Sequence, residues 1–310
     1  MNIVITGSEG FVGHYVAQHF CKLGHKVFGI DNLCRYGKRR ETLSQYPNYI
    51  FIEHDLTQSF SWYFATIKPH IIIDMASIVG GVSKFNTNNK FDDMINNIYI
   101  HNHMLNWAKV LYNDNILKRF ITISSSIVYH NSNHEEENKD VVIPTHPYGY
   151  YKYTCEYLTK QANIPYTICR LYNCIGVGED DEKHAHVFAD FARQLNRSKQ
   201  IVIGNNTIRN FVKCEDIGVV LEKILSKNIT INQTYNVCSS KYLSMKDVAK
   251  NLVNVQRFLD EYISIKYDNK DRYEFDIPIM QGNYKKLYDA IKYIPNSYHI
   301  DWKKILEYYQ

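Results

Sequence analysis

The chain has 310 residues, of which 45% are hydrophobic and 22% charged, with a formal net charge of +4. This size allows a sizeable core, while so weak a net charge argues against a nucleic-acid-binding surface. Strand-like residues begin at Asn2 and no apolar stretch is long enough to span a bilayer, so we expect neither a signal peptide nor a membrane segment. The seven cysteines never form Cys-x-x-Cys, which indicates reduced thiols of a cytoplasmic protein and no metal site.

The first predicted elements form a phosphate-binding turn. Residues 2–6 have the pattern of a buried strand, and Gly7, Gly10 and Gly13 turn the chain into a helix that runs to about Leu23. Glycines let the backbone approach a pyrophosphate closely, and a helix N-terminus favours its negative charge. The spacing departs from Gly-x-Gly-x-x-Gly, so an ordinary turn is the alternative.

The second predicted strand, over residues 26–30, ends in Asp31 and Asn32. An acidic residue at this place suits the ribose hydroxyls of NAD. An acidic loop start is the alternative, and the arginines within residues 35–40 leave room for the 2′-phosphate of NADP. The pattern favours NAD.

A third predicted strand, over residues 49–53, leads into Asp55, where folds of this kind contact adenine. A fourth strand, over residues 71–75, leads into a loop that contains Gly80 and Gly81. Glycines let such a loop lie close to a ligand, although a plain turn is equally consistent with the sequence.

Strand and helix continue to alternate through the first half of the chain. A long helix is expected over residues 92–112, a fifth strand over 120–125 and a sixth over 165–171, while the acidic segment 130–146 is expected to be a surface loop. Alternation of this kind predicts an α/β fold, a Rossmann-type doubly wound parallel sheet.

A candidate catalytic helix lies between the fifth and sixth strands. Tyr148 and Lys152 are four residues apart, so on a helix the ammonium group can approach the phenol and favour its ionised form. The same spacing recurs at residues 242/246, 262/266 and 288/292, but only this pair has Pro147 at a helix start and a preceding strand that ends in the serine cluster 124–126. An ionised phenol near neutral pH can act as an acid or a base.

The pattern after the sixth strand is less regular. Asn173 follows that strand, residues 179–185 form a loop, a helix begins at His186, and Arg209 lies in a loop over residues 204–211. We expect a smaller, ligand-capturing C-terminal α/β domain here.

Eight motifs in order resemble the extended short-chain dehydrogenase/reductase family, in particular its NAD-dependent nucleotide-sugar epimerases, dehydratases and reductases. They cover nearly the whole chain: Thr6-Gly-x-x-Gly-Phe-Val-Gly13, Asp31-Asn-Leu33, Ser124-Ser125-x-x-Val-Tyr129, Pro147-Tyr148-x-x-x-Lys152, Arg170-Leu-Tyr-Asn173, Arg209-Asn-Phe-Val, Glu215-Asp216 and Tyr235-Asn-Val237. The glycine loop after residue 79 and His186 resemble GDP-fucose synthase and GDP-mannose 3,5-epimerase, whereas Asp31 to Cys34 resembles UDP-galactose 4-epimerase.

The resemblance assigns roles to individual residues. The implied catalytic residues are Ser125, Tyr148 and Lys152. The predicted cofactor-binding residues are Gly7, Gly10, Phe11, Val12, Gly13, Asp31, Asn32, Asp55, Leu56, Met75, Ala76 and Ser77, together with Tyr148 and Lys152. The implied substrate-binding residues are Gly80, Gly81, Ser126, Asn173, His186, Arg209 and Arg272. Asn173 and Arg209 are expected to hold a diphosphate; a surface salt bridge is the alternative for Arg209.

The implied reaction is reversible hydride transfer at C4 of a UDP or GDP sugar, with NAD as the cofactor. Tyr148 takes the C4 hydroxyl proton, Ser125 hydrogen-bonds the same oxygen, and Lys152 keeps Tyr148 ionised. A 4-epimerase and a 4-keto-sugar reductase resembling GDP-fucose synthase need the same groups, so both outcomes stay open. A non-catalytic nucleotide-binding relative and a steroid or flavonoid reductase are further alternatives.

Two positions in the sequence argue against the chemistry of the dehydratases and of the 3,5-epimerising relatives. The resembling dehydratases place acids directly after the catalytic hydroxyl, and the 3,5-epimerising relatives place a cysteine two residues after it, whereas this chain has Ser126 and Ile127 there. We therefore predict neither dehydration nor inversion at C3 or C5.

The resemblance also predicts domains and assembly. Residues 1–170, joined by residues 211–237, should form the NAD-binding domain, and residues 171–310 should mainly bind the nucleotide sugar. A homodimer is expected through the helices over residues 92–112 and 148–162.

Overall fold

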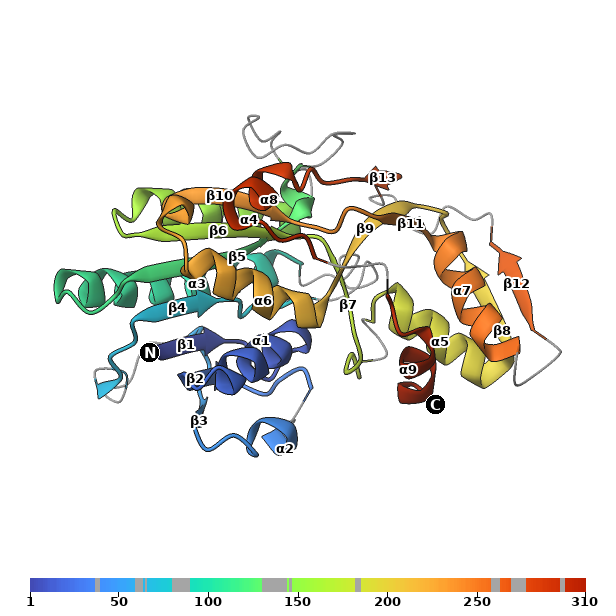
Figure 1. Ribbon diagram of the computed structural model, residues 1–310, viewed down its shortest axis with the longest axis horizontal. Helices are drawn as coiled ribbons and strands as arrows, with labels where there is room; N and C mark the ends of the chain where they lie inside the picture. Colours follow the sequence, from blue (N-terminus) through green and yellow to red (C-terminus); the bar gives the residue numbers. More distant parts are fainter. Residues whose placement is uncertain are drawn as a thin grey trace.

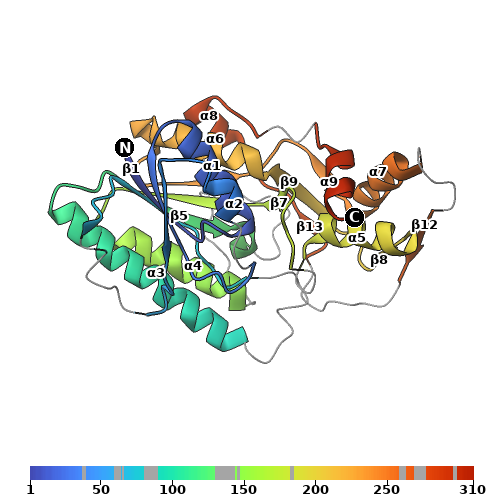
Figure 2. The ribbon, with the colours of Figure 1, turned by 90° about the horizontal axis from the view of Figure 1, so that it is seen from below.

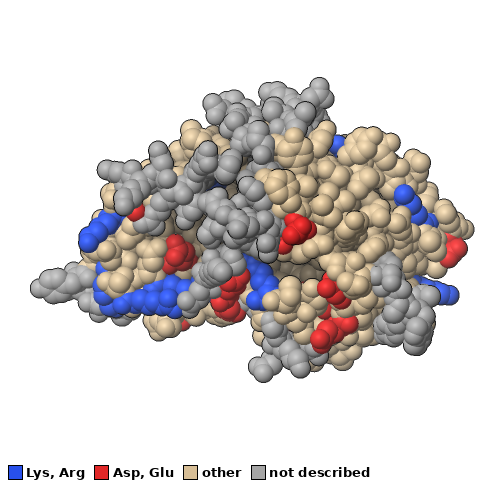
Figure 3. Space-filling view, turned by 180° about the vertical axis from the view of Figure 1, so that it is seen from behind, with Lys and Arg blue, Asp and Glu red and all other residues tan. Residues whose placement is uncertain are grey.

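The computed structural model describes residues 1–36, 40–58, 64, 66–79, 90–129, 144, 147–181, 185–257, 263–268, 277–295 and 299–310 (Figure 1). The segment predicted as an acidic surface loop lies outside these residues except for Pro144, as do Gly80, Gly81 and Arg272. On the face shown in Figure 3, basic and acidic side chains are interspersed among a majority of uncharged residues. Within the described ranges, no helix is long and apolar enough to span a membrane.

The main sheet consists, among the described residues, of seven parallel strands in the order β10-β6-β5-β4-β1-β2-β3. Their bounds are β1 (Asn2–Thr6), β2 (Lys26–Asp31), β3 (Tyr49–Glu53), β4 (Ile71–Asp74), β5 (Arg119–Ser125), β6 (Tyr166–Leu171) and β10 (Gln233–Val237). Most of these strands are buried, which explains their continuous runs of Ile and Val. The strand order reverses between β1 and β4, which confirms the predicted doubly wound sheet.

Helices cover both faces of this sheet (Figure 2). On one face α1 (Phe11–Lys22), α6 (Cys214–Leu225) and α8 (Lys285–Ile291) share a hydrophobic core with the strands. On the other face lie α3 (Lys90–Asn113) and α4 (Pro147–Gln161). Helix α4 begins at Pro147, which confirms the helix start predicted from this proline.

A second, smaller group of strands and helices adjoins the carboxyl ends of the main strands. Its elements are β7 (Asn173–Ile175), α5 (Val187–Ser198), β8 (Gln200–Ile203), β9 (Ile208–Lys213), β11 (Tyr242–Ser244), α7 (Met245–Arg257), β12 (Ser264–Tyr267), β13 (Ile279–Met280) and α9 (Trp302–Tyr308). Among the described residues, the remaining elements are the short helices α2 (Arg40–Leu43), η3 (Ser126–Tyr129) and η5 (Asn228–Thr230). Helices α5, α7 and α9 share a hydrophobic core of their own.

One sequence expectation is corrected here. Arg209 lies in strand β9 and not in a loop, because residues 208–213 pair with β7, β11 and β13. The turn signals of the preceding residues end before this strand begins. The division of the chain at residue 170 stays a prediction, and α8 shows that a segment beyond residue 237 also packs on the main sheet.

Candidate active site

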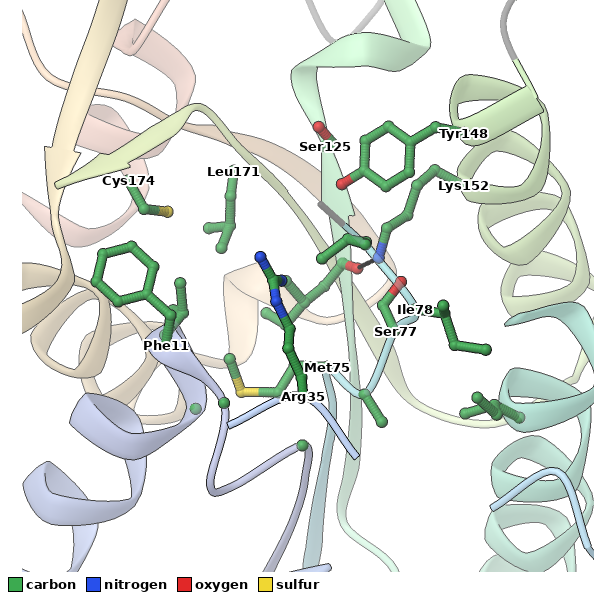
Figure 4. A pocket seen from close by; sticks show the side chains of 18 of the residues that line it. Phe11, Arg35, Met75, Ser77, Ile78, Ser125, Tyr148, Lys152, Leu171 and Cys174 are labelled. Atoms are coloured by element: carbon green, nitrogen blue, oxygen red, sulfur yellow. Dashed lines mark hydrogen bonds between the residues drawn. The ribbon is translucent and has the colours of Figure 1, made fainter. Parts of the chain in front are cut away.

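A cavity of about 710 Å³ lies at the carboxyl ends of the main strands, where the strand order reverses. Open α/β sheets bind ligands at such a switch point. Every predicted site residue that the structure describes lines this cavity: Gly7, Gly10, Phe11, Val12, Gly13, Asp31, Asn32, Asp55, Leu56, Met75, Ala76, Ser77, Ser125, Ser126, Tyr148, Lys152, Asn173, His186 and Arg209. The fold thus gathers residues from both halves of the chain around one space (Figure 4).

The glycine turn between β1 and α1 forms one wall of the cavity. Gly7 has a φ of +68°, and a Cβ atom on Gly13 would stand 2.0 Å from the Gly7 carbonyl oxygen, so side chains are excluded at both positions. Gly10 precedes the first turn of α1, and no side chain caps the helix there. The backbone N–H groups at this helix start are therefore suited to a phosphate, as a dinucleotide requires.

Asp31 stands at the end of β2, where the sequence predicted a ribose-binding acid. Its carboxylate accepts hydrogen bonds from the backbone N–H groups of Leu33 (2.9 Å) and Glu9 (3.0 Å). Burial raises the pKa of Asp31, and these backbone donors partly offset that rise. The Glu9 carboxylate also lines this end of the cavity and accepts a hydrogen bond from the Tyr49 hydroxyl at 2.8 Å.

The loop after β4 lies beside the glycine turn. The backbone N–H groups of Met75 and Ala76 both donate to the Thr6 hydroxyl at 2.9 Å, and that hydroxyl donates to Asp74 at 3.0 Å. These bonds join the ends of β1 and β4. Their effect is to hold Met75, Ala76 and Ser77 against the cavity.

The serine cluster and the candidate catalytic helix α4 form the opposite wall of the cavity (Figure 4). Ser125 ends β5, and its hydroxyl accepts a hydrogen bond from the Ile127 backbone N–H at 3.3 Å and lowers the pKa of Tyr148 on α4. Lys152 is buried one turn further along α4. Its ammonium group donates to the Ile123 carbonyl oxygen at 2.8 Å.

The electrostatics of Tyr148 differ from the sequence expectation. Burial raises the pKa of Tyr148 to about 12, and hydrogen bonds from Ser125 and Tyr151 and the charge of Arg35 only partly oppose that rise. Burial also lowers the pKa of Lys152, whose ammonium group is engaged by a backbone carbonyl. Lys152 alone therefore does not acidify the phenol in this structure.

The residues predicted to bind substrate that the structure describes, Ser126, Asn173, His186 and Arg209, also line the cavity. Ser126 donates to the Met280 sulfur at 2.8 Å, and Asn173 begins β7. Arg209 is buried in β9, where its guanidinium group donates to the Ile208 carbonyl oxygen at 2.9 Å. This burial disfavours the alternative of a surface salt bridge.

The sequence did not reveal the charged partners of His186. Its ring bonds to the buried Glu179 carboxylate, and Arg35 extends from the loop after β2 toward Glu179 (3.9 Å) and Asp181 (3.4 Å). Arg35 and Glu179 are 144 positions apart, so no local pattern links them. Only the acidic run 179–182 signalled charge at this place.

Comparison with protein families identifies the chain. Residues 3–238 match the model of the NAD dependent epimerase/dehydratase family. The chain belongs to this family. This membership confirms the family resemblance and the NAD cofactor predicted from the sequence.

Characterised relatives of the chain carry several activities. The dTDP-D-glucose 4,6-dehydratase of Dictyostelium discoideum is 28% identical over 278 residues, covering 82% of this chain and 62% of that protein. A trifunctional UDP-glucose 4,6-dehydratase/UDP-4-keto-6-deoxy-D-glucose 3,5-epimerase/UDP-4-keto-L-rhamnose-reductase of Arabidopsis thaliana is 26% identical, covering 87% of this chain and 41% of that protein. The chain thus spans less than two thirds of the length of these relatives.

Solved structures show the same fold. The UDP-glucuronic acid 4-epimerase of Bacillus cereus, in complex with UDP-glucuronic acid and NAD, superposes with a TM-score of 0.83 at 20% identity over 99% of this chain and 97% of that one. The UDP-glucose 4-epimerase of Thermotoga maritima, with UDP-glucose, gives a TM-score of 0.81 at 23% identity over 100% and 98% of the two chains.

Proposed function

We propose that the chain catalyses reversible hydride transfer at C4 of a nucleotide-diphosphate hexose, with the outcome of a 4-epimerase. The observation that carries this proposal is the placement of Ser125, Tyr148 and Lys152 opposite the glycine turn across one cavity. A dinucleotide bound along that turn and Asp31 would direct its reactive ring toward these side chains.

The proposed chemistry at C4 balances without a further reagent. The Tyr148 oxygen accepts the proton of the C4 hydroxyl, while the Ser125 hydroxyl donates a hydrogen bond to the same sugar oxygen. When bound along the glycine turn and Asp31, NAD would supply the acceptor for the C4 hydride. A 4-keto sugar results, and return of the hydride to the opposite face of the sugar, with the proton from Tyr148, gives the 4-epimer.

We assign the substrate diphosphate to Asn173 and Arg209. Both line the cavity at the start of β7 and within β9, two strands that pair with each other. A guanidinium group suits a diphosphate because its planar fork donates several hydrogen bonds at once. The rigid strand pairing supports a fixed position for the charged part of the substrate.

The proposal confines the redox chemistry to C4, although several relatives are 4,6-dehydratases. A dehydratase needs an acid–base group that reaches C5 and C6. The Ser126 hydroxyl donates a hydrogen bond to the Met280 sulfur, and the Ile127 side chain packs against a small apolar cluster that includes Met280. Neither side chain can exchange protons with a sugar carbon.

A 4-keto-sugar reductase is the second candidate. The observation that favours it is His186, whose ring faces the cavity while bonded to Glu179 and resembles the corresponding histidine of GDP-fucose synthase. The same Ser125, Tyr148 and Lys152 would serve this reaction, with Tyr148 donating its proton to the ketone.

The test begins with a thermal-shift screen of UDP, GDP and dTDP sugars in the presence of NAD, with Tyr148→Phe as the matched inactive control. Stabilising sugars are then incubated with the enzyme in deuterated water and followed by NMR. We expect a 4-epimer without deuterium on carbon. Deuterium at C3, C5 or C6 would contradict the proposal, and turnover only of a 4-keto sugar with NADH would favour the reductase.

A further inference from the structure

Tyr151 lies on α4 between Tyr148, to which we assign proton transfer, and Lys152. It is 3% exposed and stands three residues after Tyr148, so both face the sheet from the same side of the helix. The two rings meet edge to face with centroids 5.2 Å apart, and Tyr151 lowers the pKa of Tyr148. The Lys152 ammonium group lies 5.2 Å from the centroid of the Tyr151 ring.

The Tyr151 hydroxyl is the first member of a series of hydrogen-bonded side chains. It is hydrogen-bonded to the Ser77 hydroxyl, which in turn donates to the Asn97 side-chain oxygen at 3.3 Å. That oxygen also accepts the Ile78 backbone N–H at 2.7 Å, while the Asn97 amide nitrogen donates to the Ile78 carbonyl oxygen at 3.1 Å. The two backbone bonds orient the Asn97 amide so that its oxygen, and not its nitrogen, faces Ser77.

While Tyr148 is protonated, the orientation of Asn97 determines which hydroxyl donates and which accepts along this series of hydrogen bonds. Ser77 donates to Asn97, so the Tyr151 hydroxyl donates to Ser77, which leaves its oxygen as an acceptor for the neighbouring Tyr148 hydroxyl. When Tyr148 is ionised, it needs a donor in place of an acceptor. The Tyr151 and Ser77 hydroxyls can both rotate to meet this need, because the Asn97 oxygen keeps its bond from Ile78.

We propose that Tyr151 is a positioning residue for proton transfer at Tyr148, with a hydroxyl that changes from acceptor to donor as the catalytic phenol ionises. No proton is transferred along these hydrogen bonds, since the Tyr151 and Ser77 hydroxyls each keep their own hydrogen and only rotate. The Tyr151 ring has a second role, because its face holds the Lys152 ammonium group while the Ile123 carbonyl oxygen accepts a hydrogen bond from it. Both roles of Tyr151 rest on the proposed function of Tyr148, and they add one residue to the proposed proton-transfer site.

Tyr151→Phe tests the hydroxyl and keeps the ring that contacts Lys152. The NAD-loaded protein is labelled with ring-carbon-13 tyrosine, the Tyr148 resonance is assigned with Tyr148→Phe, and its ionisation is followed by NMR. We expect the pKa of Tyr148 to rise by about one pH unit in Tyr151→Phe, because a hydrogen bond to a charged group is lost. Tyr150→Phe is the matched control, since Tyr150 is an exposed neighbour on the same helix, and it should leave the titration unchanged.

Site-specific 3-fluorotyrosine at position 151 gives a second measurement with the opposite sign. It keeps the hydroxyl and the packing but makes the hydroxyl a stronger donor, so the pKa of Tyr148 should fall. A Tyr148 titration unchanged in both the Phe and the fluorotyrosine proteins would overturn the proposal.

The NMR titration requires no sugar, so its result is independent of whether a nucleotide sugar is turned over. If a substrate emerges from the screen, the acid limb of the kcat profile should move upward in Tyr151→Phe by the same interval, with KM unchanged. A lower kcat at every pH without movement of this limb would show a merely structural role and contradict the proposal.

Discussion

The Asp31 carboxylate shows how burial and hydrogen bonding compete at a single residue. Two backbone N–H groups hold it at 2.9 and 3.0 Å, yet burial still raises its pKa. A neutral ribose edge can share this carboxylate with the backbone donors, whereas a 2′-phosphate would place a second negative charge beside it. The neighbouring Glu9 carboxylate increases that repulsion.

NAD should therefore bind at least about tenfold more tightly than NADP, because juxtaposed like charges cost more than one decade of affinity. Asp31→Asn should reduce this ratio, and Glu9→Gln separates the contribution of the second carboxylate. Fluorescence titration of both cofactors measures the dissociation constants. Equal affinities in the unmodified protein would mean that Arg35 controls this end of the cavity.

Tyr148→Phe should reduce turnover by roughly a hundred- to ten-thousand-fold, since it removes the proposed proton carrier and leaves the ring in place. The affinity for NAD should change little. Steady-state kinetics with the sugar identified in the screen, together with NAD titration, measure both effects. Substrate-driven reduction of NAD at the unmodified rate would rule Tyr148 out as the proton carrier.

At the scale of elements, a buried ion pair joins α4 to the main sheet. Glu156 and Arg170 are both 1% exposed and form two hydrogen bonds, at 2.6 and 2.8 Å. Ser124 donates to the same carboxylate at 2.6 Å. The pair therefore links α4, β5 and β6 directly behind the serine cluster.

Glu156→Gln should destabilise the protein by about 3 kcal/mol, because it leaves the Arg170 charge buried without its partner. Urea unfolding measures the loss. The exposed pair of Lys285 and Asp289 provides the control, and Asp289→Asn should change stability little. A double replacement of Glu156 and Arg170 by Leu and Met should cost less than Glu156→Gln alone; a larger loss would contradict this explanation.

Helices α3 and α4 carry several exposed apolar side chains. They are Phe91, Ile95, Tyr99, Val110, Tyr112, Tyr150 and Tyr157. Phe91, Ile95 and Tyr99 are four residues apart and share one face of α3. A surface of this kind on two adjacent helices suits a twofold contact with a second copy.

We predict a homodimer at micromolar concentration by light scattering, and a shift to monomer in Val110→Lys with Tyr157→Lys. Ile229→Lys serves as the control, because Ile229 is an exposed apolar residue outside both helices. A monomeric unmodified protein, or an equal response in the control, would rule out this interface.

At the scale of the whole molecule, charged groups connect the two walls of the cavity. Arg35 follows β2 of the main sheet, whereas Glu179 and Asp181 follow β7. Burial alone would raise the pKa of Glu179, but the His186 ring and Arg35 lower it. Partial desolvation would lower the pKa of the half-exposed His186 ring, but the Glu179 carboxylate raises it.

These opposite shifts predict a pH window for stability. The lowered pKa of Glu179 contributes stability above its ordinary value of 4.5, and the raised pKa of His186 contributes below its ordinary value of 6.5. The loss of stability in Glu179→Gln should therefore be greatest near about pH 5.5 and smaller at about pH 3 and 9. Thermal unfolding across pH measures it, with the exposed Glu307→Gln as the control. A loss independent of pH would contradict the coupling.

Local patterns in the sequence were sufficient for much of the fold and for the position of the candidate site. Buried parallel strands appear as apolar runs, the glycine turn needs its residue types for backbone reasons, and Pro147 marks a helix start. These signals arise from neighbours along the chain. For that reason the strands, the turn, and the residues around Ser125 and Tyr148 were predictable.

Tertiary structure alone decided how the groups in the cavity are charged and held. Pairing with three strands placed Arg209 in β9, and packing gave Lys152 the Ile123 carbonyl oxygen as a partner in place of the phenol. Burial, which depends on every surrounding element, raised the pKa of Tyr148 against the expectation from spacing. Contacts between residues far apart in the chain determine these properties, and no short pattern records them.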